Sequence, residues 1–157
     1  MTTDTCTVRN SSVAEIASAP NFSDLLDEYC AESGITELGH ANAQLATYQA
    51  MEDLGVLKTI AVHVKGELQG FVCVLVHTLP HFGRRVGISE SLFVAKAARH
   101  TGAGMALIQA AEAVSAENEA EAFLLSAPVG SNLCKIAPAI GYRHTNETFF
   151  KVLGPKH

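Results

Sequence analysis

Residues 90–107, which read ESLFVAKAARHTGAGMAL, place a strand end, a basic loop and a glycine-containing helix start in immediate succession. The residues up to Val94 predict a β-strand, and the apolar spacing after Gly102 predicts an amphipathic helix. The first turn of a helix has unpaired N–H groups and a partial positive charge, which favour a bound phosphate. Gly102 and Gly104 lack the Cβ atoms that would keep an anion from the backbone. The stretch therefore predicts a phosphate site at the start of the helix.

Basic side chains in the same loop strengthen this prediction, because Arg99 and His100 add hydrogen-bond donors and Lys96 adds charge. Two other phosphate motifs fit less well. A dinucleotide-binding fingerprint needs a third glycine at the position of Leu107, and a P-loop needs a Gly-Lys-Ser/Thr triplet that the sequence lacks. Taken alone, the glycines also fit an ordinary helix start.

The segments before residue 58 predict two helices. A first helix is predicted between Asn21, as its N-cap, and Gly34, at its end. Its apolar stripe has helical spacing and consists of Phe22, Leu25, Leu26, Tyr29 and Cys30. A second helix is predicted over 40–54, with an inner side formed by Leu45, Tyr48 and Met51.

A three-stranded meander is predicted next, with strands at 58–64, 67–79 and 86–95 separated by tight turns. The segment 102–118 is predicted to be helical. Its inward residues are Met105, Ile108, Ala111 and Val114 or Ser115.

Three further elements complete the predicted order. The largely apolar run 122–127 predicts a strand covered on both faces. The segment 131–139 is predicted to form a short helix, and 142–153 one or two closing strands. This order predicts an α/β (α+β) fold with a mixed, mostly antiparallel central sheet and helices on both faces. Because no repeat or low-complexity linker interrupts the chain, we expect a single domain over 1–157.

The composition narrows the class of protein. Hydrophobic residues make up 48% of the chain and charged residues 17%, which is typical of a folded domain. No apolar run approaches the roughly 20 residues that cross a bilayer, and the first ten residues lack an apolar signal core. We therefore expect no membrane association and a cytoplasmic location. Four widely spaced cysteines predict free thiols, and the scattered histidines predict no metal site.

The net charge of −5 is unevenly distributed. The segment 10–57 contains eight acidic residues and no lysine or arginine, which favours a positively charged partner or else an ordinary solvated surface. The segment 77–111 contains one acid and four cations, namely Arg84, Arg85, Lys96 and Arg99. This basic footprint is too small for nucleic acid binding.

The pattern Leu92-x-Val94, four residues, and Arg99-x-x-Gly102-x-Gly104 resembles the pyrophosphate-binding motif of the GCN5-related N-acetyltransferases (GNATs). The similarity covers roughly 58–153, with the elements in the same order. The resemblance implies an enzyme that transfers the acetyl group of acetyl-CoA to an amine by direct attack on the thioester. The acceptor would be a small cationic amine or a protein amine.

The resemblance also assigns cofactor-binding residues. It implies that backbone groups of Phe93 and Val94 hold the pantetheine arm. It implies that Asn132 touches the cofactor, although its spacing to the Gly141-Tyr142 pair is shorter than usual. The pyrophosphate would be bound by backbone N–H groups of Arg99, His100, Thr101, Gly102, Ala103 and Gly104.

The reaction needs a base. A lysine-like amine has a pKa of about 10.4, and its deprotonation near neutral pH costs roughly 4–5 kcal/mol. Glu90 is the candidate, because period two places it on one strand face with Leu92 and Val94, and because family members often carry a glutamate at this position. Alternatively, Glu90 faces solvent or pairs with Arg84 or Arg85. Competing bases are His77 and His81, which are expected near the turn of the meander.

The general acid is missing from the pattern. Many GNATs carry a tyrosine four residues before the Gly-aromatic pair, where this chain has Ala137, and Tyr142 is expected to pack in the core. Water, or the modest basicity of the thiolate itself, would then suffice. Two alternatives follow, namely a non-catalytic acyl-CoA-binding or interaction module and a fold relative that no longer binds the cofactor. Pairing of exposed sheet edges leaves a homodimer open.

Overall fold

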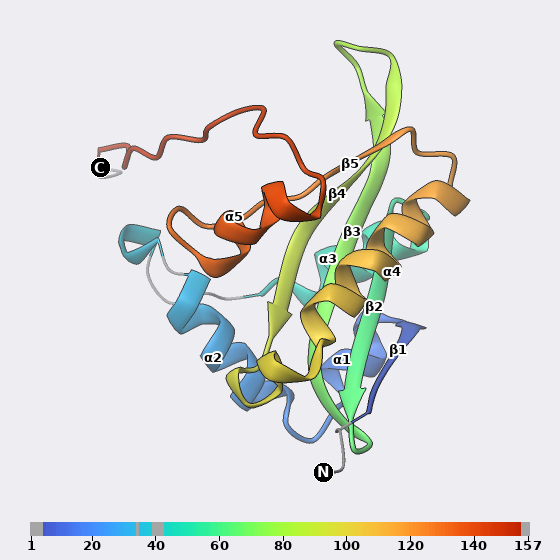
Figure 1. Ribbon diagram of the computed structural model, residues 1–157, viewed down its shortest axis with the longest axis vertical. Helices are drawn as coiled ribbons and strands as arrows, with labels where there is room; N and C mark the ends of the chain where they lie inside the picture. Colours follow the sequence, from blue (N-terminus) through green and yellow to red (C-terminus); the bar gives the residue numbers. More distant parts are fainter. Residues whose placement is uncertain (1–4, 34, 39–42, 155–157) are drawn as a thin grey trace.

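The structure, a computed structural model, describes residues 5–33, 35–38 and 43–154. Within these ranges, five strands form one sheet in the order β1-β2-β3-β4-β5 (Figure 1). They are β1 (Cys6–Ser11), β2 (Leu57–Val64), β3 (Glu67–Leu79), β4 (Arg84–Val94) and β5 (Ala122–Leu124). The first four pair antiparallel, and β5 is parallel to β4. The predicted mixed, mostly antiparallel sheet is thus confirmed.

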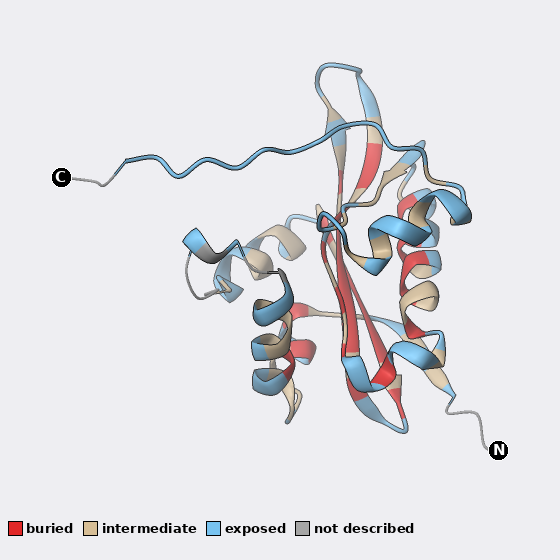
Figure 2. Cartoon of the chain, turned by 60° about the vertical axis from the view of Figure 1, so that its left-hand side comes forward, coloured by how far each residue is buried: buried red, intermediate tan, exposed pale blue. Residues whose placement is uncertain are grey.

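Helices cover both faces of the sheet (Figures 1 and 2). One face carries α1 (Val13–Ala17), α2 (Phe22–Ser33) and α3 (Leu45–Asp53), and the other carries α4 (Ala103–Glu117). Two 3-10 segments precede α3 and α4, namely η1 (Thr36–Leu38) and η2 (Lys96–Thr101). After β5 come α5 (Asn132–Ile136) and η3 (Ala137–Ile140). No helix in the described ranges combines the length and apolar character of a membrane span.

Alternating side chains along β3 create the two layers of the core. Those that face α1, α2 and α3 are Phe71, Cys73 and Leu75. Those that face α4 are Val72, Val74 and Val76. Because both faces are apolar, the strand is buried along most of its length, as the red strands between the helix layers in Figure 2 show.

The meander and the long helix after it are confirmed. Along α4, Ile108, Ala111, Val114 and Ser115 are buried as predicted, whereas Met105 is only half-buried. The helix lies very close to the sheet at Gly87 of β4, where a Cβ atom would lie 2.1 Å from Ser115 Oγ. The absence of a side chain at Gly87 thus leaves room for α4 to approach the sheet at this point.

Sequence reasoning missed two elements at the N-terminus, β1 and α1. The strand pairs antiparallel with β2, and its Cys6 and Val8 pack against the α4 cluster. Its alternation is short and mostly polar, so hydrophobic patterning alone gives a weak signal. The helix starts with a Ser12-x-x-Glu15 pattern, in which Ser12 Oγ accepts from the Glu15 N–H at 3.1 Å. This Ser-x-x-Glu capping signature is the sequence signal from which α1 could have been predicted.

Two predictions about the C-terminal third are wrong. The run 122–127 forms only the three-residue β5, which is half-exposed and not covered on both faces. The segment 142–153 contains no strand, and it runs away from the sheet as an extended arm in both ribbon views (Figures 1 and 2). Phe149 is 86% exposed and Leu153 82% exposed, so these side chains of the arm do not pack on the sheet. Because no closing strand returns to the sheet, β5 stays short and open.

The predicted helix boundaries are partly confirmed. Asn21 directly precedes α2, but its side-chain amide donates to Leu68 O at 2.8 Å, and its Oδ1 has no partner among the described residues, so it does not cap the helix. The predicted second helix corresponds to α3, whereas the start at residue 40, like Gly34, lies outside the described residues.

We expect Gly87→Ala to destabilise the fold by about 1–3 kcal/mol, because the added methyl group would overlap Ser115. Chemical denaturation followed by circular dichroism measures this change. Gly104→Ala is the matched control, since the nearest described atom to its Cβ would be Val94 Cγ2 at 4.0 Å and alanine is the better helix former. Equal stabilities for the two variants would contradict the close approach of α4 to β4.

Candidate active site

The strand β4 contains one residue more than the part of β3 that faces it. Cys73 pairs with Ser91, whereas the next residue, Val74, pairs with Ser89. Glu90 therefore lies in a β-bulge without a partner in the ladder. Such bulges redirect side chains and are common beside functional sites.

The bulge changes which face the residues of β4 take. Gly87 lies under Ser115 of α4, and Leu92, five residues later, packs in the same α4 cluster. In a regular strand, residues five apart face opposite sides. The extra residue at Glu90 accounts for the difference.

Glu90 consequently reaches the layer of α3. The Tyr48 hydroxyl donates to Glu90 Oε1 at 2.8 Å and lies 3.0 Å from Oε2, and the Ser91 hydroxyl also donates to Oε2. The prediction that Glu90 shares a face with Leu92 and Val94 is wrong, because those two residues pack against α4. The bulge thus brings a carboxylate, exposed to solvent, to two hydroxyl groups on the opposite side of the sheet.

The arginines considered as partners of Glu90 are engaged elsewhere. Arg84 Nη1 lies 3.1 Å from Glu121 Oε1, and Arg85 Nε donates to Asn118 O at 2.6 Å. The alternative of a Glu90 ion pair with either arginine is therefore wrong.

The two candidate histidines lie towards the turn of the β3–β4 hairpin, as predicted. His77 pairs with Val86, four residues and about 13 Å along the strand from Glu90. His81 lies farther out, with its ring 4.9 Å from that of Phe82. The structure does not bring either histidine to the bulge.

The predicted phosphate loop is formed by η2 and the start of α4. Gly102 joins them in the left-handed region, at φ 84°, and nothing lies within 4 Å of where its Cβ would be. The amides of Ala103, Gly104 and Met105 begin α4, where helix geometry leaves N–H groups without an intrahelical acceptor. Open space above Gly102 and free first-turn amides fit an anionic group.

The basic side chains of this loop are held by acidic residues of α2. Arg99 pairs with Glu32, and its Nε donates to Val94 O at 3.0 Å. Lys96 Nζ lies 3.8 Å from Glu32 Oε1, and the Lys96 N–H donates to Glu28 Oε1 at 2.7 Å. These contacts tie α2 to the loop, so the backbone amides are what the loop offers to an anion.

The remaining predicted cofactor residues lie around this loop. His100 is exposed, and Thr101 Oγ1 donates to Ala98 O at 2.5 Å. The ladder between β4 and β5 spans only 86–88, so in the described structure the β4 edge at Phe93 and Val94 has no strand neighbour on the β5 side. That edge offers backbone groups to an extended arm.

Three positions that the sequence singled out follow β5, namely Asn132, Ala137 and Tyr142. Asn132 begins α5 and is exposed. Ala137 O accepts the Tyr142 N–H at 3.0 Å. The Tyr142 hydroxyl donates to Glu112 Oε1 at 2.6 Å, and its ring packs 6.5 Å from that of Phe123, so it is half-exposed at the margin of the core.

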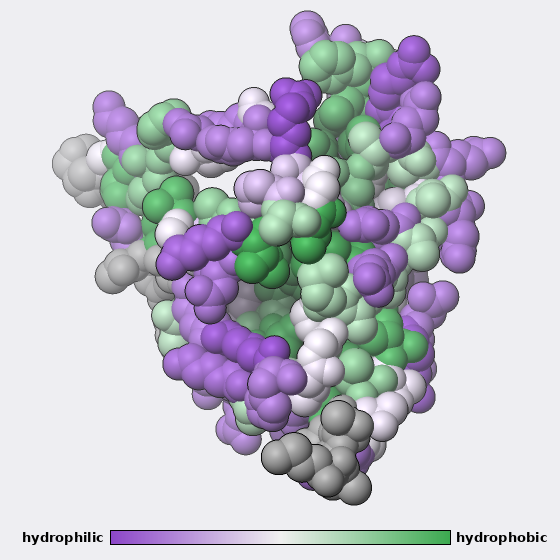
Figure 3. Space-filling view, in the orientation of Figure 1, coloured by the Kyte–Doolittle hydropathy of each residue, from purple (hydrophilic) through white to green (hydrophobic). Residues whose placement is uncertain are grey.

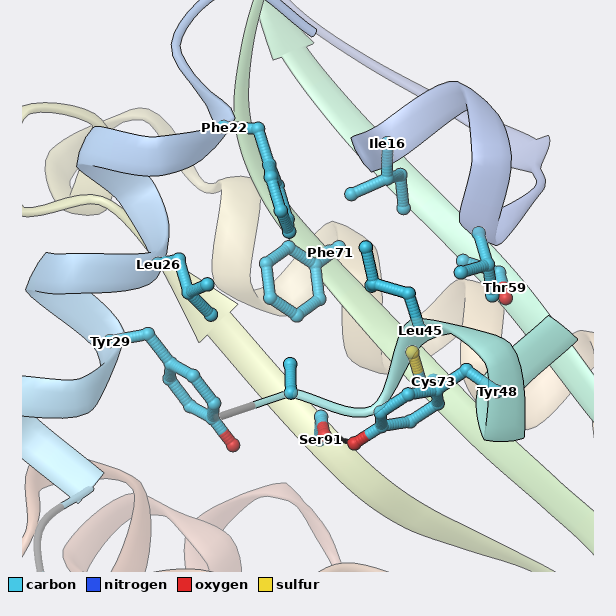
Figure 4. A pocket seen from close by; sticks show the side chains of 12 residues that line it. Ile16, Phe22, Leu26, Tyr29, Leu45, Tyr48, Thr59, Phe71, Cys73 and Ser91 are labelled. Atoms are coloured by element: carbon cyan, nitrogen blue, oxygen red, sulfur yellow. Dashed lines mark hydrogen bonds between the residues drawn. The ribbon is translucent and has the colours of Figure 1, made fainter. Parts of the chain in front are cut away.

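A pocket lies between α2, α3 and the sheet, next to the bulge. Figure 3 shows this side of the molecule hollowed, with apolar surface inside and hydrophilic residues on the rim. The hydroxyl groups of Tyr29, Tyr48 and Ser91 lie at one end of the pocket, and Cys73 forms part of its floor (Figure 4). Sequence reasoning missed these four residues. The predicted inner-face positions of Tyr29 and Tyr48 on their helices were the available signal.

The hydroxyl and thiol groups of the pocket stay protonated near neutral pH. Burial is the main cause that raises the pKa of Tyr48, and the hydrogen bond to Glu90 raises it further. Burial likewise raises the pKa of Tyr29 and raises the pKa of the Cys73 thiol to about 12. Tyr48 therefore acts as a hydrogen-bond donor that positions the Glu90 carboxylate.

Neither a family model nor a curated protein matches the sequence. Solved structures match the fold. A ribosomal-protein-alanine N-acetyltransferase from Brucella melitensis biovar Abortus 2308 aligns with TM-score 0.71 over 96% of this chain and 100% of its own, at 18% identity. An aminoglycoside acetyltransferase from an uncultured soil metagenomic sample aligns with TM-score 0.72 over 96% and 99% of the two chains, at 19% identity.

The chain has the GNAT fold. A transcriptional regulator from Bacillus halodurans C-125 also shares it, with TM-score 0.69 over 95% of this chain and 100% of its own, at 15% identity. The likeness thus establishes the architecture, and the chemistry has to be argued from the site. In the GNAT fold of this chain, the described residues contain no group of three His, Cys, Asp or Glu side chains arranged to hold a metal ion.

We expect Cys73 to resist alkylation while Cys134 reacts, because a thiol with a pKa of about 12 is ionised in only about one molecule in ten thousand at pH 8. Cys134 is an exposed free thiol. Iodoacetamide labelling at pH 8 followed by peptide mass spectrometry measures both sites, and labelling in urea is the control in which both react. Similar labelling of the two cysteines in the native protein would show that the pocket floor is open to solvent.

Proposed function

We propose that the protein is an N-acetyltransferase that moves the acetyl group of acetyl-CoA to an amine. The observation that carries this proposal is the continuity of β4 with the loop after it. One segment presents a hydrogen-bonded carboxylate at Glu90, an open strand edge at Phe93 and Val94, and free amides after Gly102. A thioester held along that edge would have its phosphates at the helix start and its acyl end towards Glu90.

The residues present fit acetyl-CoA. The pyrophosphate would be held by first-turn amides of α4, where Gly102 leaves open space. The pantetheine arm would pair with the free edge of β4, as an added strand does. Acetyl-CoA supplies the acyl carbon that the amine attacks, and the C–S electron pair leaves on sulfur as thiolate.

Glu90 would accept the proton of the attacking amine. Its carboxylate is fixed by Tyr48 and Ser91 but remains exposed, so it is both oriented and accessible. Proton transfer to a positioned carboxylate, directly or through one water, supports attack by the neutral amine. The proton then returns to the thiolate through solvent, because the Tyr142 hydroxyl is bound to Glu112.

A non-catalytic acyl-CoA-binding module is the second candidate. Two observations favour it. Ala137 stands where many GNATs carry the tyrosine that serves as general acid, and the Tyr142 hydroxyl is hydrogen-bonded to Glu112. Release of coenzyme A upon incubation with a panel of amines separates the two functions. Binding of acetyl-CoA without thiol release from any amine would favour the module. The variant Cys134→Ser removes the exposed thiol that adds background to this assay.

We expect Gly102→Glu to abolish acetyl-CoA binding, because a carboxylate at the helix start repels the diphosphate. Isothermal titration calorimetry measures the affinity. Gly102→Ala is the matched control, since it imposes the same strain at φ 84° without the charge, so both variants lose similar stability and only the glutamate variant loses binding. Unchanged affinity in Gly102→Glu would refute the phosphate assignment.

We expect Glu90→Gln to lower kcat by about 10²-fold or more while the affinity for acetyl-CoA stays within a factor of two or so, because the amide keeps the shape but accepts no proton. Steady-state thiol release and calorimetry supply the two quantities. Tyr48→Phe keeps the carboxylate and removes its donor, so we expect a smaller loss. Wild-type turnover of Glu90→Gln across the pH range would remove Glu90 from the mechanism.

A further inference from the structure

The pocket beside Glu90 is a mostly apolar hollow that is partly open to solvent. Its empty space of about 500 Å³ includes that open solvent, so the enclosed part is smaller. Phe71 and Cys73 of β3 form its floor and are each 7% exposed. Phe22 and Leu26 of α2 form one wall, with Leu45 of α3 opposite (Figure 4).

Most of the polar groups in the pocket lie at one end of it. Its body is apolar apart from the Thr59 hydroxyl, and the hydroxyl groups of Tyr29, Tyr48 and Ser91 lie together at one end (Figure 4). Two of these hydroxyls donate to the Glu90 carboxylate, so that end also carries the negative charge. A ligand that matches this arrangement has a positively charged or proton-donating group at one end and an apolar body at the other.

The acidic residues of the first third do not create a second cationic site in the pocket. None of them lines the pocket within the described ranges. Glu15 accepts from Ser11 Oγ at 2.8 Å, Glu28 from the Lys96 N–H at 2.7 Å and Glu52 from the Val13 N–H at 3.0 Å. Glu32 pairs with Arg99 and Lys96. These acids fix the helices and the loop, so a polyamine would find no carboxylate among the described pocket-lining residues for its distal charge, which would be costly to bury.

We infer that the acceptor is a small primary amine with one aromatic or branched aliphatic group, which occupies the pocket while the amine lies at the Glu90 end. This inference rests on the proposed function and narrows it from amines in general to apolar monoamines. The rings of Tyr29 and Phe71, which both line the pocket, stand edge to face with their centroids 6.0 Å apart, and such edges suit an aromatic ring.

The test compares 2-phenylethylamine with 1,4-diaminobutane as acceptors, by thiol release at saturating acetyl-CoA. We expect kcat/KM for the aromatic amine to exceed that for the diamine by about tenfold or more, because only the aromatic amine buries an apolar group. A preference for the diamine, or equal values, would overturn the inference.

A pair of variants tests the place of the apolar group. Leu26→Glu puts a carboxylate on the pocket wall outside the core clusters, and Leu54→Glu puts one at a position that is 78% exposed and does not line the pocket. We expect Leu26→Glu to raise KM for 2-phenylethylamine by about tenfold and to narrow the preference over the diamine, while Leu54→Glu changes neither. Circular dichroism confirms that both variants fold.

Direct measurement of amine binding separates a failure of the proposed function from a failure of the pocket assignment. Calorimetric titration of 2-phenylethylamine should show binding to the wild type and to Leu54→Glu that is about tenfold weaker in Leu26→Glu. Thiol release from no amine would overturn the proposed function. Equal binding of the aromatic amine by wild type and Leu26→Glu would overturn the pocket assignment, whether or not the protein is an enzyme.

Discussion

The site depends on the single extra residue in β4. Counted back from Leu92, which packs against α4, a regular alternation would place the Glu90 carboxylate on the α4 face, where an unpaired charge is costly. With the bulge, the same carboxylate meets the hydroxyls of Tyr48 and Ser91 at the mouth of an apolar pocket. The strand then resumes its alternation, so that Phe93 and Leu92 still contribute to the two opposite core layers.

A second constraint joins the two halves of the site. Glu28 and Glu32 of α2 hold the loop that precedes α4, while Phe22 and Leu26 of the same helix form a wall of the pocket. One helix thus contacts both the proposed diphosphate loop and the proposed acceptor pocket. The exposed ion pairs add little stability individually, but together with the backbone hydrogen bond they set the position of α2 over the sheet.

Much of the fold could be predicted because hydrophobic period encodes it directly. The valine-rich β3 and the stripe on α4 are long and strongly patterned, and both were placed to within a few residues. β1 and α1 were missed because six polar-rich residues and a five-residue helix carry little periodic signal. The arm at 142–153 has a strand-like composition, yet composition does not say whether a strand finds an edge to pair with.

Within the site, the glycines at the helix start could be recognised from the local sequence alone. The bulge at Glu90 and its contact with Tyr48 depend on residues 42 apart, and no local pattern contains that information.

The exposed arm and the short edge strand β5 are both part of the same molecule. The sheet ends in a mostly unpaired row of N–H and C=O groups, and Phe149, Phe150 and Val152 offer a β-favouring segment to any such row. Exchange of this segment between two molecules would be reciprocal and would end in a closed pair with two-fold symmetry. If each molecule instead passed its arm to the next, the same contact would repeat without closure and grow into a filament.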